Sequence, residues 1–490
     1  MDKYNFPDFM KKKVIRLNFK SVKIIAFIVF SATISCIPLK KKMHETGKFK
    51  MQRLVVHENK RFIQYEDGEP FFWLGDTGWL LFHKLNREEV ELYLENRKGK
   101  GFNVIQAVLI HHLPQRNFYG DYAFINSDPS MPDTTPGNTF EDSTEYDYWD
   151  HIDWVIDQAE KRGIYMALVI MWRSAVNQAL RIKKNDATWA KIYASFLTKR
   201  YRNKPNIIWI NGGDCKGSEN IDIWRQFGNT IKSLDPNHLM TFHPFGRTCS
   251  CMWFHNDPWL DFNMFQSGHR RYDQDNDMGF GQDNWRYVEM AYKKEPPKPV
   301  LDGEPSYEDI PQGLHDSSQP YWTAADVRRY AYWSVFAGSF GHTYGHNAIM
   351  QFHKPEFGKG AYGVRDYWYE AINDTGAYQM QYLKKLMLSR PFFERVPDQS
   401  LVSTETNGTK YDYVIATQGK IYAFYYTYTG RSFDAVLGKI SGDYVKANWY
   451  NPKNGKTIYI GRFKNYGVKH FDPPGEKKDG NDWVLILDSD

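Results

Sequence analysis

Two carboxylic acids that follow short apolar runs are the residues of this sequence best suited to catalysis. Asp214 comes after the run 207–210 and two glycines, and Glu304 comes after the similar run 300–303. Each run is typical of a buried strand that ends in a tight turn and presents its last residue there. Glycoside hydrolysis needs two carboxyl groups, one to protonate the leaving oxygen and one to attack the anomeric carbon or activate water. We predict that Asp214 is the acid/base and Glu304 the nucleophile.

Both acids also have a purely structural interpretation. Asp214 could form a turn, or it could cap the helix that is predicted from Ile221 onward. Glu304 could form a structural ion pair with an arginine. In that case Asp302, which lies two residues earlier and on the same face of the strand, is the substitute nucleophile. The catalytic reading therefore depends on the elements that position the two acids.

Eight apolar runs alternate with helical patterns along most of the chain. The predicted strands lie at residues 70–76, 101–106, 164–170, 207–214, 239–243, 262–267, 300–304 and 339–344. Helices are predicted at 148–162, 188–201, 221–234 and 323–337, and another begins after its N-cap Asn86. Eight strand–helix units within residues 36–385 indicate an α/β fold, a (β/α)8 TIM barrel. A doubly wound open sheet is the alternative, but no GxGxxG turn follows the first strand.

The active site of such a barrel lies at the C-terminal ends of its strands. In this arrangement Asp214 ends the fourth strand and Glu304 the seventh, on opposite sides of the barrel mouth. Aromatic and neutral hydrogen-bonding residues at other strand ends suit a polyhydroxylated ligand such as a sugar. The substrate-binding candidates are Asp76, His111, His112, Trp172, His243, His269 and Tyr344. Asp76 could equally be a helix cap, and a single histidine is more often structural than functional.

Residues 386–490 have a different pattern from the barrel. Short apolar runs at 413–416, 421–426, 445–450 and 483–487 are separated by turns such as Asn454-Gly455 and Asp479-Gly480. Short strands joined by such turns predict a small all-β sandwich domain.

The positive charge of the chain is concentrated at its N-terminus. The net charge is +5, and residues 1–35 alone contain seven Lys/Arg and two acids, so the remainder is neutral. A neutral body argues against a nucleic-acid partner. The basic head and the apolar run 24–36 have the layout of a secretory signal, and Cys36 is a candidate lipidation site. We expect residues 1–35 to direct the protein to the periplasm or cell surface; an uncleaved membrane anchor would place it on the same side.

The remaining cysteines show no metal-binding pattern. Cys215, Cys249 and Cys251 lack CxxC or Cys/His spacing, so we interpret them as packing residues and expect no metal or other cofactor. The sequence also has no HExxH motif, and the pair His342 and His346 lacks a glutamate beside the first histidine. A zinc peptidase is therefore a poor interpretation.

Several of these segments resemble the apiosidase-like glycoside hydrolases. The similarity lies in residues 72–77 (FWLGDT), 101–106 (GFNVIQ), 209–214 (WINGGD), 241–244 (TFHP) and 301–305 (LDGEP). Residues 449–452 (WYNP) and 471–475 (FDPPG) resemble the collagen-binding-type β domain that follows in that family. Cys215 stands where an arginine more often follows the acid in the family.

The resemblance implies a retaining, exo-acting enzyme on pectin side chains, with Asp214 and Glu304 as its catalytic pair. A different class of function would be a surface lipoprotein that binds glycans without cleaving them. Such a protein has no need for two acids at opposed strand ends.

Overall fold

The computed structural model describes residues 51–274 and 279–490. The predicted secretory signal and the candidate lipidation site Cys36 lie outside the described residues. None of the described helices is both long enough and apolar enough to cross a membrane.

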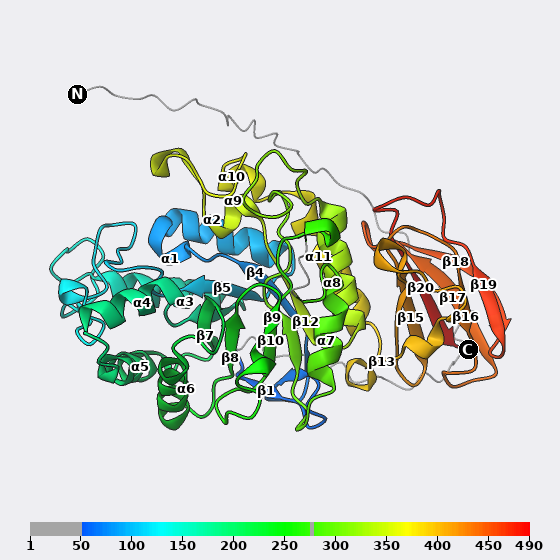
Figure 1. Ribbon diagram of the computed structural model, residues 1–490, viewed down its shortest axis with the longest axis horizontal. Helices are drawn as coiled ribbons and strands as arrows, with labels where there is room; N and C mark the ends of the chain where they lie inside the picture. The colour runs from blue at the N-terminus through cyan, green and yellow to red at the C-terminus, as the bar shows by residue number, and fades with distance from the viewer. Residues whose placement is uncertain (1–50, 275–278) are drawn as a thin grey trace, which may run out of the picture. The chain divides into compact units, whose positions relative to one another are not determined.

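Eight parallel strands form the barrel that the sequence predicts (Figure 1). Their order in the sheet is β8-β7-β6-β5-β4-β12-β11-β10, and the short strand β9 pairs with β10 in the antiparallel direction. The hydroxyl of Thr241 on β8 donates to the carbonyl of Phe262, directly before β10, at 2.7 Å, which links the two ends of the sheet. The strands are β4 (Trp73–Thr77), β5 (Val104–Val108), β6 (Tyr165–Val169), β7 (Ile207–Cys215), β8 (Met240–Pro244), β9 (Thr248–Cys249), β10 (Asn263–Gln266), β11 (Val300–Asp302) and β12 (Gly341–Tyr344).

Alternate residues of these strands pack into two separate cores, because neighbouring side chains point to opposite faces of a sheet. The inner core contains Val104, Val108, Ala167, Val169, Ile208 and Ile210. The outer core, between strands and helices, contains Ile105, Ala107, Met166, Leu168, Ile207 and Trp209. Gln106 faces inward with the first set and donates to the carbonyl of Gly303 at 2.7 Å, directly before Glu304. The barrel interior thus helps to fix the backbone of the predicted nucleophile.

The predicted helices are present, and most of them begin at a recognisable cap. Asn86 forms a capping box with Glu89 at the start of α2 (Arg87–Gly99). The sequence did not predict α4 (Arg173–Ile182), α7 (Asn284–Tyr292) or α11 (Thr375–Leu388), and in all three the N-cap residue makes no side-chain cap hydrogen bond. The other helices of the barrel are α1 (Leu81–Lys84), α3 (Tyr148–Lys161), α5 (Thr188–Tyr201), α6 (Ile221–Leu234), α8 (Ala324–Phe336), α9 (Asn347–Met350) and α10 (Trp368–Ala371).

A three-stranded antiparallel sheet precedes the barrel. It consists of β1 (Leu54–Val56), β2 (Ile63–Tyr65) and β3 (Pro70–Phe71). Phe71 packs edge-on against Tyr165 at the start of β6, with 5.3 Å between ring centroids. This sheet therefore lies at the end of the barrel where the strands begin, opposite to the catalytic end.

The C-terminal region is all-β, as predicted. A six-stranded antiparallel sheet has the order β13-β14-β15-β20-β17-β18, and β16 and β19 form a second sheet of two strands. Phe433 and Phe471 of the small sheet contact Trp449 of the large one, at 6.3 and 6.5 Å between centroids. The strands are β13 (Val396–Pro397), β14 (Ile415–Gln418), β15 (Tyr422–Thr427), β16 (Phe433–Val436), β17 (Tyr444–Tyr450), β18 (Thr457–Lys464), β19 (Val468–Phe471) and β20 (Trp483–Ser489).

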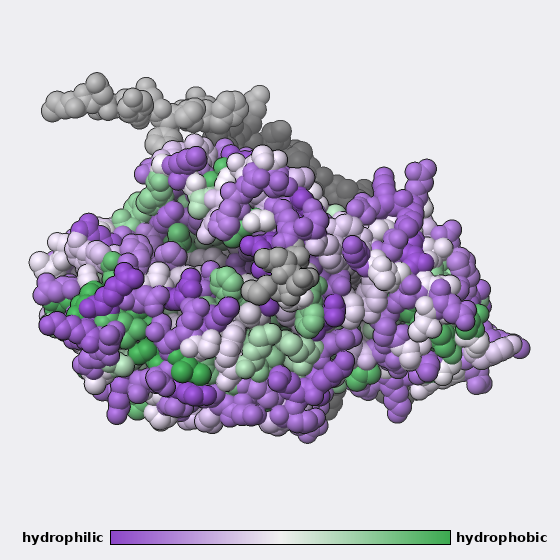
Figure 2. Space-filling view, in the orientation of Figure 1, coloured by the Kyte–Doolittle hydropathy of each residue, from purple (hydrophilic) through white to green (hydrophobic). Residues whose placement is uncertain are grey.

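The surface of the described residues is mostly hydrophilic on the face shown in Figure 2, and apolar residues occur there only in small groups. A pocket at one end of the barrel combines polar groups with aromatic rings and is described next.

Candidate active site

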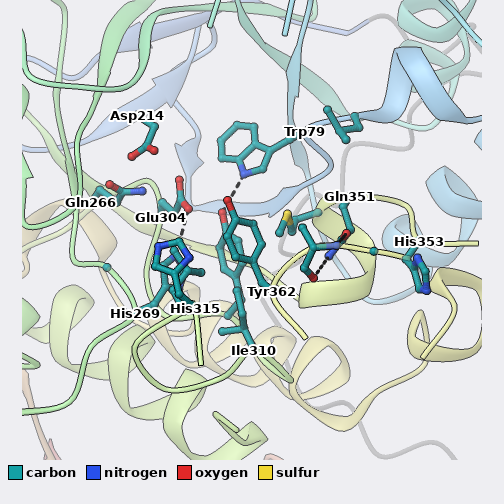
Figure 3. A pocket seen from close by; sticks show the side chains of 18 of the residues that line it. Trp79, Asp214, Gln266, His269, Glu304, Ile310, His315, Gln351, His353 and Tyr362 are labelled. Atoms are coloured by element: carbon teal, nitrogen blue, oxygen red, sulfur yellow. Dashed lines mark hydrogen bonds and ion pairs between the residues drawn. The ribbon is translucent and has the colours of Figure 1, made fainter. Parts of the chain in front are cut away.

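A pocket of about 560 Å³ opens at the C-terminal ends of the barrel strands (Figure 3). Its size is in the usual range for a small-molecule or sugar site. Both predicted catalytic acids line it, and so do three of the predicted substrate-binding residues, His111, Trp172 and His269. Chain segments from Trp79 to Tyr362 thus meet at one cavity, as expected for a TIM barrel.

Asp214 reaches the pocket because β7 breaks its regular pattern at its last residues. Gly212, Gly213 and Asp214 have φ angles of 82°, 123° and 50°, and pairing with β8 is irregular between Gly212 and Cys215. Positive φ is uncommon for a residue with a side chain and is often found at functional sites. The irregularity turns the Asp214 carboxyl group toward the barrel mouth.

Glycine is required at position 213 for two reasons: the backbone has a positive φ angle, and it lies very close to Trp172. A Cβ atom at this position would lie 2.7 Å from Cε3 of the indole. We expect Gly213→Ala to lower the free energy of unfolding by about 2–4 kcal/mol, from backbone strain and overpacking together. Activity should fall with it, because Trp172 and Asp214 would be displaced. Urea unfolding and kcat/KM measure the two effects.

Gly68 provides a matched control for this substitution. It has a φ of 91°, and a Cβ atom there would meet nothing within 4 Å. Gly68→Ala should cost only the backbone strain of about 1–2 kcal/mol and leave activity unchanged. Equal effects of the two substitutions on activity would contradict the role given to the Trp172 contact.

Glu304 is held between two histidines. Its Oε2 lies 3.0 Å from Nε2 of His243, and its Oε1 lies 3.2 Å from Nε2 of His269. Nδ1 of His243 accepts a hydrogen bond from the backbone amide of Asp214 at 3.3 Å, which leaves the proton on Nε2 to be donated to Glu304. Burial raises the pKa of Glu304, but the hydrogen bonds from His243 and His269 outweigh it and hold the pKa well below its usual range.

The pKa of Asp214 is shifted in the opposite direction. Burial raises it most, the negative charge of Glu304 raises it further, and His243 and Arg173 oppose the shift. Two carboxyl groups whose surroundings separate their pKa values in this way are suited to be a proton donor and an ionised partner. The pocket therefore combines an acid whose pKa is raised with an acid whose pKa is lowered.

An aromatic frame surrounds the two acids. Trp79 Nε1 donates to the Tyr307 hydroxyl at 2.9 Å, and the Tyr307 ring meets His269 edge-on at 4.8 Å between centroids. Trp79 also contacts Trp172, with 5.6 Å between centroids. The sequence prediction did not include Trp79 or Tyr307. Their position two residues after β4 and three residues after Glu304 was the signal that could have identified them.

The other predicted substrate-binding residues do not line the pocket. Asp76 is fully buried, where its Oδ2 accepts from the Tyr93 hydroxyl at 2.7 Å and pairs with Arg97 at 2.5 Å. Tyr344 is buried too and donates to Glu308 at 2.6 Å. His112 is exposed at the surface beside His111. His243 acts through its contact with Glu304. Binding of substrate by these four residues remains a prediction.

The role of Asp76 can be tested through stability. Asp76→Asn would leave the buried Arg97 without its charged partner, so we expect a loss of about 3–5 kcal/mol in the free energy of unfolding. Glu91→Gln, an exposed acid on the same helix as Arg97, should change it by less than about 0.5 kcal/mol. Urea unfolding measures both. A raised KM with unchanged stability would instead favour a role for Asp76 in binding substrate.

Asp302 is buried beside the pocket rather than in it. Its Oδ2 accepts from the Ser267 hydroxyl at 2.8 Å and from the Asn284 amide at 3.1 Å. Burial raises its pKa to about 7, although these hydrogen bonds oppose the shift. The side chain thus faces its hydrogen-bond partners, whereas Glu304 faces the cavity.

Cys215, Cys249 and Cys251 are buried and form no disulfide. Within the described ranges, no group of three or more His, Cys, Asp or Glu side chains could hold a metal ion.

Comparisons with known proteins agree on the type of enzyme. A family model described as "Apiosidase-like, catalytic domain" matches residues 57–394, and one described as "Putative collagen-binding domain of a collagenase" matches residues 396–488. A solved structure titled "Glycoside hydrolase" is 50% identical with a TM-score of 0.82, covering 89% of this chain and 97% of that one. A glycoside hydrolase family 5 structure from Bacteroides vulgatus ATCC 8482 is 48% identical with a TM-score of 0.83, covering 89% and 93%. A search of curated proteins found no match.

Proposed function

This chain belongs to the apiosidase-like family of glycoside hydrolases, and from that premise we propose that Asp214 and Glu304 cleave a glycosidic bond by a retaining, two-step reaction. The observation that carries the proposal is the opposite direction of the two pKa shifts within one pocket. Asp214 keeps its proton at a pH at which Glu304 is ionised, which is the starting state that the reaction needs.

In the first step Glu304 attacks the anomeric carbon while Asp214 gives its proton to the glycosidic oxygen. The bond between that oxygen and the anomeric carbon breaks, and a glycosyl ester with Glu304 forms. In the second step Asp214 removes a proton from water, which attacks the same carbon and releases the sugar and the Glu304 carboxylate. His243 and His269 stabilise the charge on Glu304 at the start and at the end.

The substrate that we propose is a side chain of an acidic plant cell-wall polysaccharide, pectin. Four cations line the pocket: Lys84, Arg247, Arg270 and Lys359. As far as the structure describes the wall of this pocket, its only carboxyl groups are the two catalytic ones. A positive wall attracts a substrate that carries uronic acid. The indoles of Trp79 and Trp172 offer flat faces for a sugar ring.

We also propose that the enzyme is exported by residues 1–35 and attached to a membrane through a lipid on Cys36. The basic head and the apolar run before that cysteine support the proposal.

Product analysis on a panel of pectic polysaccharides tests the proposed function. We expect release of a side-chain sugar from at least one acidic polysaccharide, and NMR of the first-formed product should show the anomeric configuration of the substrate. A first product of inverted configuration would overturn the retaining reaction. Cleavage of neutral polysaccharides alone would overturn the pectic substrate.

A further inference from the structure

The outer face of the C-terminal β domain carries a group of tyrosines and cations that no described core uses. We infer that this group, the basic tyrosine face, is a second binding site of the enzyme and that it holds an acidic polysaccharide outside the active site. We define it by Tyr444, Tyr459, Arg462, Lys464 and Tyr466. The choice of pectin as its polymer rests on the proposed function, but the site itself does not.

Strand pairing places four of the five members of this face on one side of the sheet, and Tyr466 follows β18 in the connection to β19, beside Lys464. Val445, Ala447 and Trp449 of β17 belong to the core between the two sheets, so the residues that alternate with them point outward. Directly opposite residues of an antiparallel pair share a face. Tyr444 is opposite Lys464, Lys446 is opposite Arg462, and Asn448 is opposite Tyr459, which places these six side chains on the outer side.

Two of the tyrosines are unusually exposed for aromatic residues. Tyr459 is 63% exposed and Tyr466 is 69% exposed. Tyr444 lies beneath Arg462, whose guanidinium carbon is 3.5 Å from the ring centroid, and Lys464 Nζ is 5.9 Å from the centroid of Tyr466. Tyr444 and Tyr466 therefore each have a cation beside the ring. A flat ring next to a cation can stack on a sugar while the cation pairs with the carboxylate of that sugar.

The charge of this part of the chain indicates an anionic partner. Residues 444–471 contain six Lys/Arg and no Asp or Glu. The carboxylate that pairs with this group is Asp490, which is shared between Lys446 and Arg462. Within the described part of the chain, Lys464 takes part in no ion pair. The excess of positive charge is complementary to a polymer with one carboxylate on each sugar.

Edge protection is the structural alternative. β18 is an edge strand of the large sheet, and cations on an edge strand prevent pairing with other chains. That function explains charge on β18, but it does not need Tyr459 and Tyr466 in water. The aromatic residues are therefore what favours a binding site.

Binding of the full-length enzyme to polygalacturonate tests the inference, with Glu304→Gln present throughout so that the polymer is not cleaved. We expect Arg462→Gln/Lys464→Gln and Tyr459→Ala/Tyr466→Ala each to weaken binding by about five- to tenfold. Lys161→Gln/Lys199→Gln, an equal change of charge at exposed lysines of barrel helices, should leave it unchanged. Tyr459→Phe/Tyr466→Phe keeps the rings and should restore most of the binding.

The chemistry of the polymer provides the second readout. Binding should weaken with added salt and be several-fold weaker for fully methyl-esterified polygalacturonate, which has the same backbone without the charge. The inference would be overturned if both double variants bound polygalacturonate as tightly as the parent enzyme. It would also be overturned if their only defect were aggregation, which is the result that edge protection predicts. Loss of collagen binding in these variants, with polygalacturonate binding intact, would replace the polysaccharide with a protein partner.

Two outcomes separate this inference from the proposed function. Without the Glu304→Gln background, the same variants should cleave a short soluble oligosaccharide at the wild-type rate, because no residue of this face lines the pocket. An enzyme that binds polygalacturonate through this face but cleaves no pectic substrate would overturn the proposed function and leave the binding site in place.

Discussion

Glu304→Gln is expected to lower kcat by at least about four orders of magnitude, because the amide cannot form the glycosyl ester. Glutamine has nearly the same shape as glutamate, and its amide oxygen can still accept a hydrogen bond from one of the two histidines that position the side chain. Single-turnover assays and circular dichroism separate a lost nucleophile from a lost fold. Added azide should restore part of the rate and yield a glycosyl azide of inverted configuration, because azide then attacks the anomeric carbon directly.

Asp302→Asn is the matched control, since it removes a carboxylate two residues away on the same segment. Its side chain is directed to Ser267 and Asn284, so we expect activity to stay within about tenfold of the wild type. If Asp302→Asn abolished activity and Glu304→Gln did not, Asp302 would be the nucleophile.

Asp214→Asn is expected to lower kcat by about 10²- to 10⁴-fold for a natural sugar leaving group, which needs a proton to depart. The loss in the first step should be small for an aryl glycoside with an acidic leaving group, because its oxygen departs without protonation. Added azide should then speed the second step and give a glycosyl azide of retained configuration. An equal loss for both kinds of leaving group would contradict the acid/base role.

The pH dependence of kcat/KM follows from the two pKa shifts. Activity needs Asp214 protonated, and burial raises its pKa, so the rate should fall as pH rises through that raised value. Activity also needs Glu304 ionised, and its low pKa moves the acid limb below about pH 4. Asp214→Asn should lose the alkaline limb and keep the acid one. Rate measurements from pH 3 to 9 check both limbs.

The barrel could be predicted because its strands are apolar runs that end in glycine or a polar residue. The same pattern predicted that Asp214 and Glu304 lie at one cavity, because the order of the strands determines which residues meet at the barrel mouth. Helix α4 follows Trp172, which is not a residue type that caps helices, and α7 has only nine residues, so each had a weak signal in the sequence. Strand β18 was missed because five of its eight residues are exposed and none is buried, which removes the alternating pattern.

The sequence could not predict which side chains of the site contact one another. Asp76 resembles a strand-end ligand in the sequence, and only the structure pairs it with Arg97 on the next helix. The side chain of Trp79 does not ionise and a tyrosine such as Tyr307 ionises only near pH 10, so neither was a candidate for acid–base catalysis. The two residues also follow their strands at different distances. Their hydrogen bond to each other depends on loop geometry that local patterns do not specify.

The charge of Glu304 is one of the causes of the raised pKa of Asp214, and this makes the protonation of one acid depend on the bonding state of the other. In the proposed reaction the glycosyl ester of Glu304 is neutral, so that cause disappears once the first step is complete. The pKa of Asp214 then falls, so the side chain is more readily ionised. This is the stage of the reaction at which Asp214 acts as a base and takes a proton from water. The catalytic cycle itself would thus switch Asp214 from donor to acceptor, and hydrolysis would return both groups to their starting state.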